Sequence, residues 1–184
     1  MSRIAIPASI AASPTASQPL LEAVRKLLGS VPNLFRMVGN SPAALEGYLG
    51  LNAALAKGKL DAKTRERLAL AVAEINACDY CLAAHSYLAK NLAKLDDVEI
   101  EANRRGGSCD AKADAAVRFA VQIARARGHV SEAELRAVKA AGFGDAEVLE
   151  IIAHVGLNTL TNYVNNVTGT DIDFPQVRAA KKAA

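Results

Sequence analysis

Two cysteines and a histidine share one eight-residue stretch of this sequence, and they are the residues best suited to chemistry. Cys78 and Cys81 form a Cys-x-x-Cys pair, and His85 follows four residues after the second cysteine. On a helix, Cys81 and His85 lie one turn apart on the same face, whereas Cys78 is about 10 Å from His85 along the axis. Because the imidazole reaches only Cys81, the spacing predicts Cys81 as the nucleophile and Cys78 as the resolving thiol.

The helix that carries these residues is expected to begin near Asp79, because Asn and Asp are typical of caps and turns. Both thiols then lie in or beside the first turn. The positive end of the helix dipole and a neighbouring imidazolium lower a cysteine pKa from its usual value of about 8.5, although the Asp79 charge opposes this. A first turn also allows the local adjustment that a disulfide between positions i and i+3 requires.

Two glutamates precede the pair, and the path of the chain decides which one assists His85. In a continuous helix Glu74 shares the face of the cysteines, and Glu66 lies about 18 Å from the first of them. In an antiparallel hairpin that reverses near residues 75–77, Glu66 lies opposite His85 and Glu74 lies at the turn. The hairpin predicts a Glu66–His85–Cys81 relay in which the carboxylate orients the imidazole.

The spacing alone leaves other chemistry open. The two cysteines and His85 can supply three zinc ligands, with Glu66 or Glu74 as the fourth, and buried cysteines are often inert. The sequence has no second Cys/His cluster to complete a structural zinc site, so the spacing favours redox chemistry over a metal site or an inert structural role. The third cysteine, Cys109, is expected in a turn without a partner, because three cysteines do not make a disulfide framework.

The remaining sequence predicts an all-α fold to position this site. Of the 184 residues 38 are alanine, which favours helix, and the six prolines all lie outside Ala43–Phe174. Cap residues and glycine stops predict seven to nine helices. Those with the clearest limits cover residues 17–28, 31–38, 42–57, 79–93, 131–141 and 145–167, with Ser17, Ser41, Asp61, Asp96, Asp110, Ser131 and Asp145 as caps.

These helices are expected to form one compact domain over residues 17–176, between a flexible arm at 1–16 and a frayed tail at 177–184. The net charge of +3 is too small to indicate a nucleic-acid partner. The longest apolar run, at 68–73, is far shorter than a membrane span, so we expect no membrane association and a cytoplasmic protein.

Two further features of the C-terminal helix have structural interpretations. His154 lies in an apolar stretch and is expected to be a core or interface residue, with a substrate pocket as the alternative. Asn158, Asn162 and Asn165 share one helix face at spacings of four and three, and we interpret them as part of an oligomer interface rather than a site.

The stretch from Lys63 to Ser86 resembles the carboxymuconolactone decarboxylase superfamily and, within it, the alkyl hydroperoxidase D branch. The pattern is a glutamate twelve residues before a Cys-x-x-Cys pair and a histidine four residues after it. The similarity covers about residues 30–176. It is supported upstream by Val31–Phe35 and Ser41-Pro42, and downstream by Asn162–Asn166 and Asp173–Pro175.

The resemblance implies an all-helical fold that assembles into trimers or hexamers. It also implies a cofactor-free dithiol peroxidase with an antioxidant role, in which Cys81 is peroxidatic, Cys78 is resolving and Glu66 supplies the carboxylate of the relay, as in the hairpin. The implied partners are a small hydroperoxide and an external dithiol or a lipoyl- or thioredoxin-like protein.

One position departs from the family pattern, because Tyr80 stands where the best-known members carry a histidine before the second cysteine. Two alternative functions accompany the peroxidase. One is a decarboxylase-like lyase or isomerase on the same scaffold, with Cys81 or His85 as acid or base. The other is a metal-binding or purely structural module.

Overall fold

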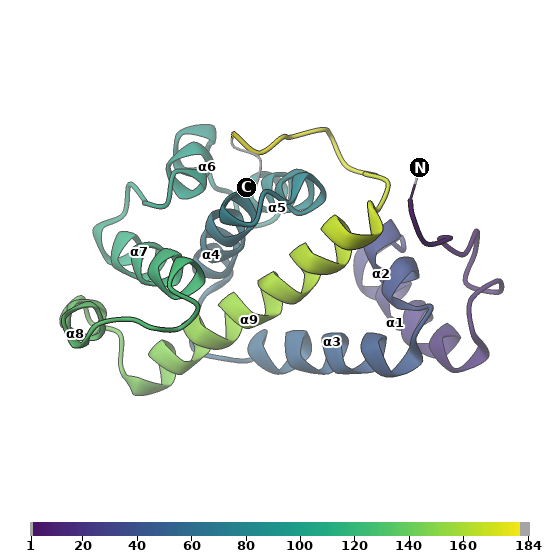
Figure 1. Ribbon diagram of the computed structural model, residues 1–184, viewed down its shortest axis with the longest axis horizontal. Coiled ribbons are helices and arrows are strands. Elements are labelled where there is room, and N and C mark those ends of the chain that lie inside the picture. The colour runs from purple at the N-terminus through teal and green to yellow at the C-terminus, as the bar shows by residue number, and fades with distance from the viewer. Residues whose placement is uncertain (1, 181–184) are drawn as a thin grey trace.

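The computed structural model describes residues 2–180, and over that range it contains helices and no strands, as predicted. Within the described residues, a 3-10 turn at Thr15–Ser17 precedes nine α-helices, which agrees with the predicted seven to nine (Figure 1). They are α1 (Gln18–Leu28), α2 (Asn33–Val38), α3 (Pro42–Leu55), α4 (Ala62–Ile75), α5 (Asp79–Asn91), α6 (Asp97–Arg104), α7 (Ala111–Arg125), α8 (Glu132–Ala140) and α9 (Asp145–Thr168).

Most predicted caps are present. The side chains of Ser41, Asp61, Asp96 and Asp110 each accept a hydrogen bond from the backbone N–H three residues later. Ser131 forms a full capping box, in which the glutamate three residues on returns a hydrogen bond to the cap backbone. These local contacts explain why so many helix starts could be read from the sequence.

Other helix limits differ from the prediction. The Ser17 hydroxyl donates to the Gly39 carbonyl at 2.7 Å instead of capping α1. Asp145 is the first residue of α9, and the cap position belongs to Gly144, whose N–H donates to Glu147 at 2.8 Å. Helices α3 and α5 each end two residues before the predicted position. Final turns often fray or tighten, so helix ends are the least predictable limits.

Helix α4 lies between two hydrophobic clusters and contributes to both. Its residues Leu70 and Ala73 face a cluster built with α1, α2, α3, α5 and α6, which also contains both cysteines of the pair. Its residues Leu68 and Val72 face a second cluster built with α7, α8 and α9. Because α4 packs on both sides, the elements that hold the dithiol are fixed against the rest of the chain.

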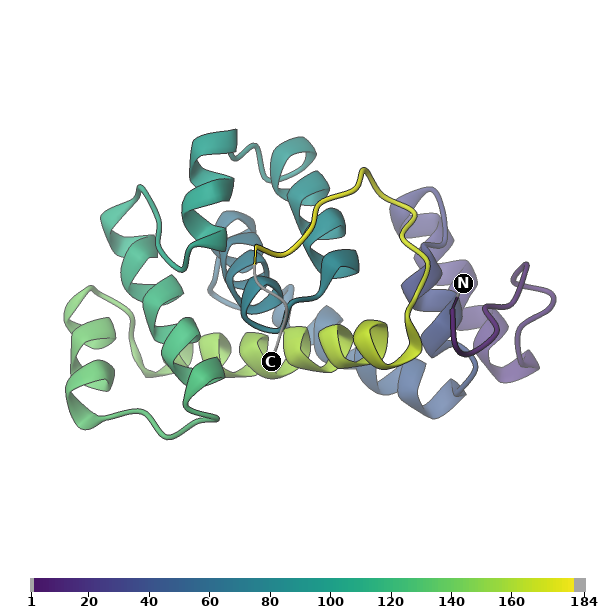
Figure 2. The same cartoon turned by 45° about the horizontal axis from the view of Figure 1, so that its top comes forward.

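The long helix α9 crosses the molecule beside α3, and the chain after it doubles back across α5 (Figures 1 and 2). Asp173 of this returning segment accepts a hydrogen bond from the Tyr80 hydroxyl at 2.8 Å, and the Ala179 N–H donates to Asp79 at 2.9 Å. The segment is therefore tied to the first turn of α5, where the cysteine pair lies.

The two terminal segments make specific contacts. Near the N-terminus, the Arg3 N–H donates to the Thr168 carbonyl at 2.6 Å, and Ile10 packs against the first cluster. Val177 and Ala179 of the expected tail also pack there, and Lys181 onward lies outside the described residues. The flexibility of the arm, the fraying of the tail and the domain limits remain predictions. No helix within residues 2–180 combines the length and apolar character needed to cross a membrane.

Candidate active site

A tight turn between α4 and α5 places the first cysteine. Ala77 adopts a left-handed conformation with φ +48°, which is uncommon for a residue other than glycine. The Ala77 N–H donates to the Glu74 carbonyl and the Cys78 N–H donates to the Ala73 carbonyl, at 3.1 and 3.0 Å. This pair of bonds is a Schellman motif, which ends α4 and reverses the chain. The structure thus contains the hairpin, not the continuous helix.

Cys78 is also the N-cap of α5, as the predicted helix start requires. Its Sγ accepts a hydrogen bond from the Cys81 N–H at 3.3 Å, and its thiol donates to Cys81 Sγ at 2.6 Å. Both cysteines are free thiols and are 0% and 2% exposed. The two sulfur atoms are therefore adjacent, outside the covalent S–S distance of about 2.05 Å but needing only a small movement to reach it.

The hairpin brings Glu66 of α4 to His85 of α5. His85 Nδ1 and Glu66 Oε2 are 2.9 Å apart, and the two side chains are 23% and 21% exposed. Burial opposes protonation of His85, but the charge and hydrogen bond of Glu66 and the nearby Cys81 together raise its pKa. Glu74 lies at the turn and bonds to Arg104 Nε at 2.9 Å instead.

The surroundings distinguish the two thiols. Burial opposes ionisation of Cys81, yet the hydrogen bond from Cys78, the positive charge of His85 and the Asn165 amide lower its pKa to about 7. For Cys78, the hydrogen bond with Cys81, burial and the charge of Cys81 all raise the pKa. Cys81 is therefore the thiol that ionises first.

Sequence reasoning misplaced the asparagines of α9. Asn165 Nδ2 donates to Cys81 Sγ at 3.2 Å, and Asn162 Oδ1 accepts from Asn76 at 2.9 Å beside the turn. Asn158 donates to the His154 carbonyl at 2.8 Å within the helix. All three α9 asparagines are buried inside the chain, so the interpretation as an oligomer interface was wrong. The sequence showed that the three asparagines share a helix face, but it did not show which part of the chain that face packs against.

Tyr48 of α3 is a second residue that sequence reasoning missed. It lines a small cavity together with Cys81 and His85. Burial, and after it the charges of Cys81 and Glu66, raise the pKa of its hydroxyl, so Tyr48 stays neutral.

Tyr80, which stands where the resembled family pattern has a histidine, connects three parts of the chain. Its hydroxyl accepts from the Leu34 N–H at 3.0 Å and donates to Asp173 at 2.8 Å, and its ring packs edge-on against Phe174. These contacts tie together α2, α5 and the segment after α9.

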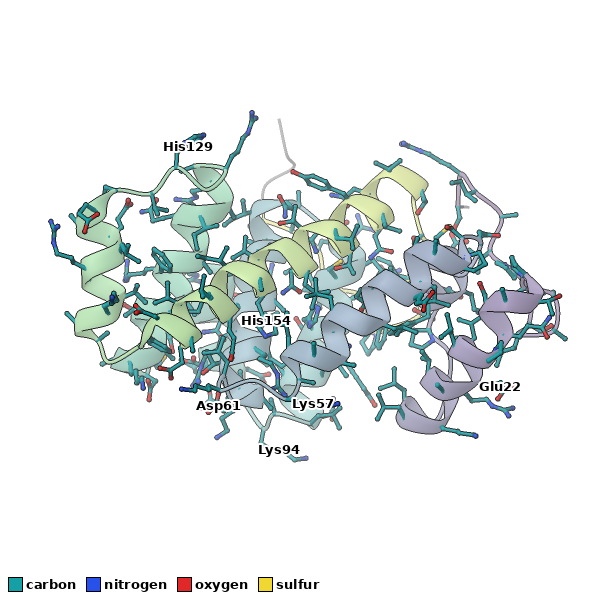
Figure 3. The ribbon with its side chains drawn as sticks, turned by 90° about the horizontal axis from the view of Figure 1, so that it is seen from below. Glu22, Lys57, Asp61, Lys94, His129 and His154 are labelled. Atoms are coloured by element: carbon teal, nitrogen blue, oxygen red, sulfur yellow. The ribbon has the colours of Figure 1, made fainter. Side chains whose placement is uncertain are left out.

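The remaining candidates lie apart from the thiols. His154 is a buried residue of α9 at the point where α9 runs beside α3, and it does not line the cavity (Figure 3). Burial lowers its pKa to about 4. His129 lies in the exposed loop after α7 at the edge of the molecule (Figure 3). Cys109 has an exposed thiol, and its backbone N–H donates to Glu99 at 2.7 Å. Within residues 2–180, no three His, Cys, Asp or Glu side chains are grouped to hold a metal ion.

These features define an all-helical protein with a buried dithiol at a helix N-terminus, flanked by a glutamate–histidine pair. Residues 42–126, which span α3 to α7, match the model of the carboxymuconolactone decarboxylase family. This match and the solved structures described next support the carboxymuconolactone decarboxylase superfamily and, within it, the alkyl hydroperoxidase D-like branch.

Two solved structures are similar over nearly the whole chain. A peroxidase-related protein from Ralstonia eutropha JMP134, with an alkylhydroperoxidase D core, is 25% identical with a TM-score of 0.83, covering 94% of this chain and 92% of that one. A peroxidase-related protein from Silicibacter sp. TM1040 is 26% identical with a TM-score of 0.80, covering 92% of this chain and 91% of that one. Similarity of this extent supports the branch as well as the fold.

Two other relatives are more distant or shorter. The debrominase Bmp8 is 18% identical with a TM-score of 0.73, covering 86% of this chain and 87% of its own, and shares the fold. A protein from Haemophilus influenzae is 52% identical over 46 residues, which are 24% of this chain. The match spans about two fifths of that relative's length, 41%.

Proposed function

We propose that this chain is a dithiol peroxidase that reduces hydroperoxides. The Cys81 thiolate attacks the terminal oxygen of the hydroperoxide, so an S–O bond forms, the O–O bond breaks and an alcohol or water leaves. The Cys78 thiol then attacks the resulting sulfenic acid, which forms the disulfide and releases water. An external dithiol reduces that disulfide and returns both thiols.

The observation that carries the proposal is the 2.6 Å contact between Cys78 Sγ and Cys81 Sγ. A sulfenic acid on Cys81 would form beside the thiol that must condense with it. The N-cap position of Cys78 favours the same reaction, since its side chain is the one at the start of α5 that faces the first turn.

The pair of Glu66 and His85 supports a proton-transfer role. Glu66 holds one ring nitrogen of His85 at 2.9 Å, which fixes the orientation of the ring and stabilises its protonated form. His85 is thereby suited to accept the proton of Cys81 and to return it to the leaving oxygen. Asn165 supports the thiolate with a neutral hydrogen bond at 3.2 Å.

We further propose that the chain works as a homo-oligomer, a trimer or a hexamer. The outward face of α9 supports this, because it carries large apolar side chains that stay exposed in the single chain: Leu149, Ile152, Leu160, Tyr163 and Val167. The proposed reductant is a small dithiol or a lipoyl- or thioredoxin-like protein, and the proposed compartment is the cytoplasm, where such dithiols are kept reduced.

The test is peroxide turnover by the purified chain with a dithiol as reductant. The proposal expects Cys81→Ser to abolish both turnover and the first oxidation. Cys78→Ser should abolish turnover but still consume one equivalent of peroxide in a single turnover. Equal retention of activity in both variants would refute the assigned roles. Activity only as a lyase, an isomerase or a debrominase, with no thiol oxidation, would refute the function.

A further inference from the structure

A small cavity lies directly beside the proposed reacting sulfur. It measures about 60 Å³ and is bounded by residues from α2, α3, α5 and α9. Its lining residues are Leu34, Tyr48, Asn52, Tyr80, Cys81, Ala84, His85, Leu157, Asn158 and Thr161. Four other pockets described within residues 2–180 contain neither cysteine of the pair, whereas this cavity is lined by Cys81.

The volume limits what can enter. One water molecule needs about 10–15 Å³ of such space, and an engineered cavity that binds benzene measures about 150 Å³. A cavity of about 60 Å³ therefore holds about four non-hydrogen atoms. Hydrogen peroxide, methyl hydroperoxide and ethyl hydroperoxide fit within that limit, and a hydroperoxide with a phenyl ring does not.

The walls of the cavity are held in place by contacts on their outer sides. Leu157 is 6% exposed and Leu34 is 8% exposed, so both are packed into the protein. The Tyr48 ring packs against Phe35 with its centroid 5.7 Å away. The Tyr80 hydroxyl is fixed by two hydrogen bonds. Only a group small enough to fit between these packed side chains can enter the cavity beside Cys81, because displacing them is costly in a close-packed interior.

The apolar and polar groups are arranged for a small peroxide. Leu157 and Tyr48 form walls, while the reacting groups Cys81 and His85 also face the cavity. Asn52 lies one turn after Tyr48 on α3 and is exposed, so the cavity reaches solvent on the α3 side.

We infer that the substrates are small, unbranched hydroperoxides and that Leu157 and Tyr48 set the size limit. This inference rests on the proposed peroxidase function. The chemistry is the same for each substrate: the Cys81 sulfur is oxidised by two electrons to the sulfenic acid, the O–O bond breaks, and the other oxygen leaves as an alcohol, or as water when the oxidant is hydrogen peroxide.

The experiment compares hydrogen peroxide, ethyl hydroperoxide and cumene hydroperoxide as oxidants of the reduced protein. Samples are quenched by alkylation, and the loss of free Cys81 thiol is followed by mass spectrometry. We expect the two small oxidants to react at least about tenfold faster than cumene hydroperoxide, the scale at which a packed site rejects excess bulk.

Leu157→Ala enlarges the cavity and is expected to raise the ratio of cumene to hydrogen peroxide rate constants by about tenfold. Leu27→Ala is the matched control, because Leu27 lies on α1, is 81% exposed and does not line the cavity, and it should leave that ratio unchanged. If Leu157→Ala does not fold, Leu157→Val takes its place with a smaller rise expected.

The outcomes separate the two claims. Cumene hydroperoxide reacting as fast as hydrogen peroxide with the wild-type chain would overturn the size limit and leave the peroxidase intact. An unchanged ratio in a folded Leu157 variant would overturn the role of that residue. No Cys81 oxidation by any of the three would overturn the proposed function itself.

Discussion

Asn165 donates its side-chain amide to Cys81 Sγ at 3.2 Å, across 84 residues of sequence. The contact joins α9 to the first turn of α5 and supports the Cys81 thiolate. Asn165→Ala is expected to raise the Cys81 pKa by about one unit, since a hydrogen bond to a charged group contributes about 1.5–3 kcal/mol and one unit equals about 1.4 kcal/mol. The measurement is the pH dependence of Cys81 alkylation, in a Cys109→Ser background that removes the exposed thiol. Asn91→Ala, at an exposed asparagine near the far end of α5, is the control, and an unchanged pKa in Asn165→Ala would contradict this role.

The rate of Cys81 oxidation should rise with pH through about 7, the pKa of its thiol, and level off above it. The thiolate is the nucleophile, so the rate falls about tenfold for each pH unit below the pKa. Stopped-flow or quenched measurements of the Cys81 oxidation rate between about pH 5 and 9 check this, because that range includes the ordinary pKa of cysteine. A midpoint near the free-cysteine value of about 8.5 would show that the surroundings do not lower the pKa of Cys81.

Glu66→Gln should shift that profile to higher pH by about one unit. Without the carboxylate the pKa of His85 falls, so Cys81 loses part of the positive charge that lowers its own pKa. Glu74→Gln is the matched control, because Glu74 is on the same helix but bonds to Arg104 at the turn. Equal profiles for the two variants would contradict the relay.

Tyr80→Phe should lower the free energy of unfolding by about 1–3 kcal/mol, since the buried Leu34 N–H loses its acceptor. Urea unfolding measures the change. Tyr163→Phe removes a hydroxyl from a residue that is 57% exposed and should change stability little. A Tyr80→Phe variant as stable as wild type would contradict the proposed tie between α2 and α5.

Glu99 should make the fold sensitive to acid. Burial opposes its ionisation, but Ser108, Asn103, the Cys109 N–H and Arg67 donate to its carboxylate and lower its pKa to about 2. Because the folded pKa lies below the unfolded value of about 4.3, the stabilisation is complete above that value and is lost as the pH falls toward 2. This stabilisation of the folded state amounts to about 3 kcal/mol. Glu99→Gln should remove the stabilisation and flatten the pH dependence of the free energy of unfolding between about pH 5 and 2. Glu101→Gln, at an exposed ion pair with Arg105, is the control; a Glu99→Gln variant with wild-type acid sensitivity would contradict this origin.

The sequence predicted the features that depend on local spacing. Cys81 and His85 share a helix face because they are four residues apart, and Ser41, Asp61 and Ser131 cap helices through bonds that span three residues. Local sequence signals were compatible both with a continuous helix after α4 and with an antiparallel hairpin. The choice depended on Ala77, which takes a left-handed conformation without the glycine that usually marks it.

Contacts between distant segments could not be predicted from spacing. Asn165 lies on a helix face with Asn158 and Asn162, and only the packing of α9 on α5 shows which of them reaches a sulfur atom. Tyr48 is an ordinary tyrosine of α3 until α2, α5 and α9 enclose it with Cys81. The sequence shows the type of such a residue, but it does not show which distant residue the side chain contacts.

The most direct test of the central claim is peptide mapping of the reduced Cys109→Ser chain after one equivalent of a small hydroperoxide. The account predicts a Cys78–Cys81 disulfide, and in Cys78→Ser a sulfenic acid on Cys81 that a dimedone probe captures. A sulfenic acid trapped on Cys78 in Cys81→Ser with none on Cys81 in Cys78→Ser, or no disulfide after peroxide is consumed, would contradict it.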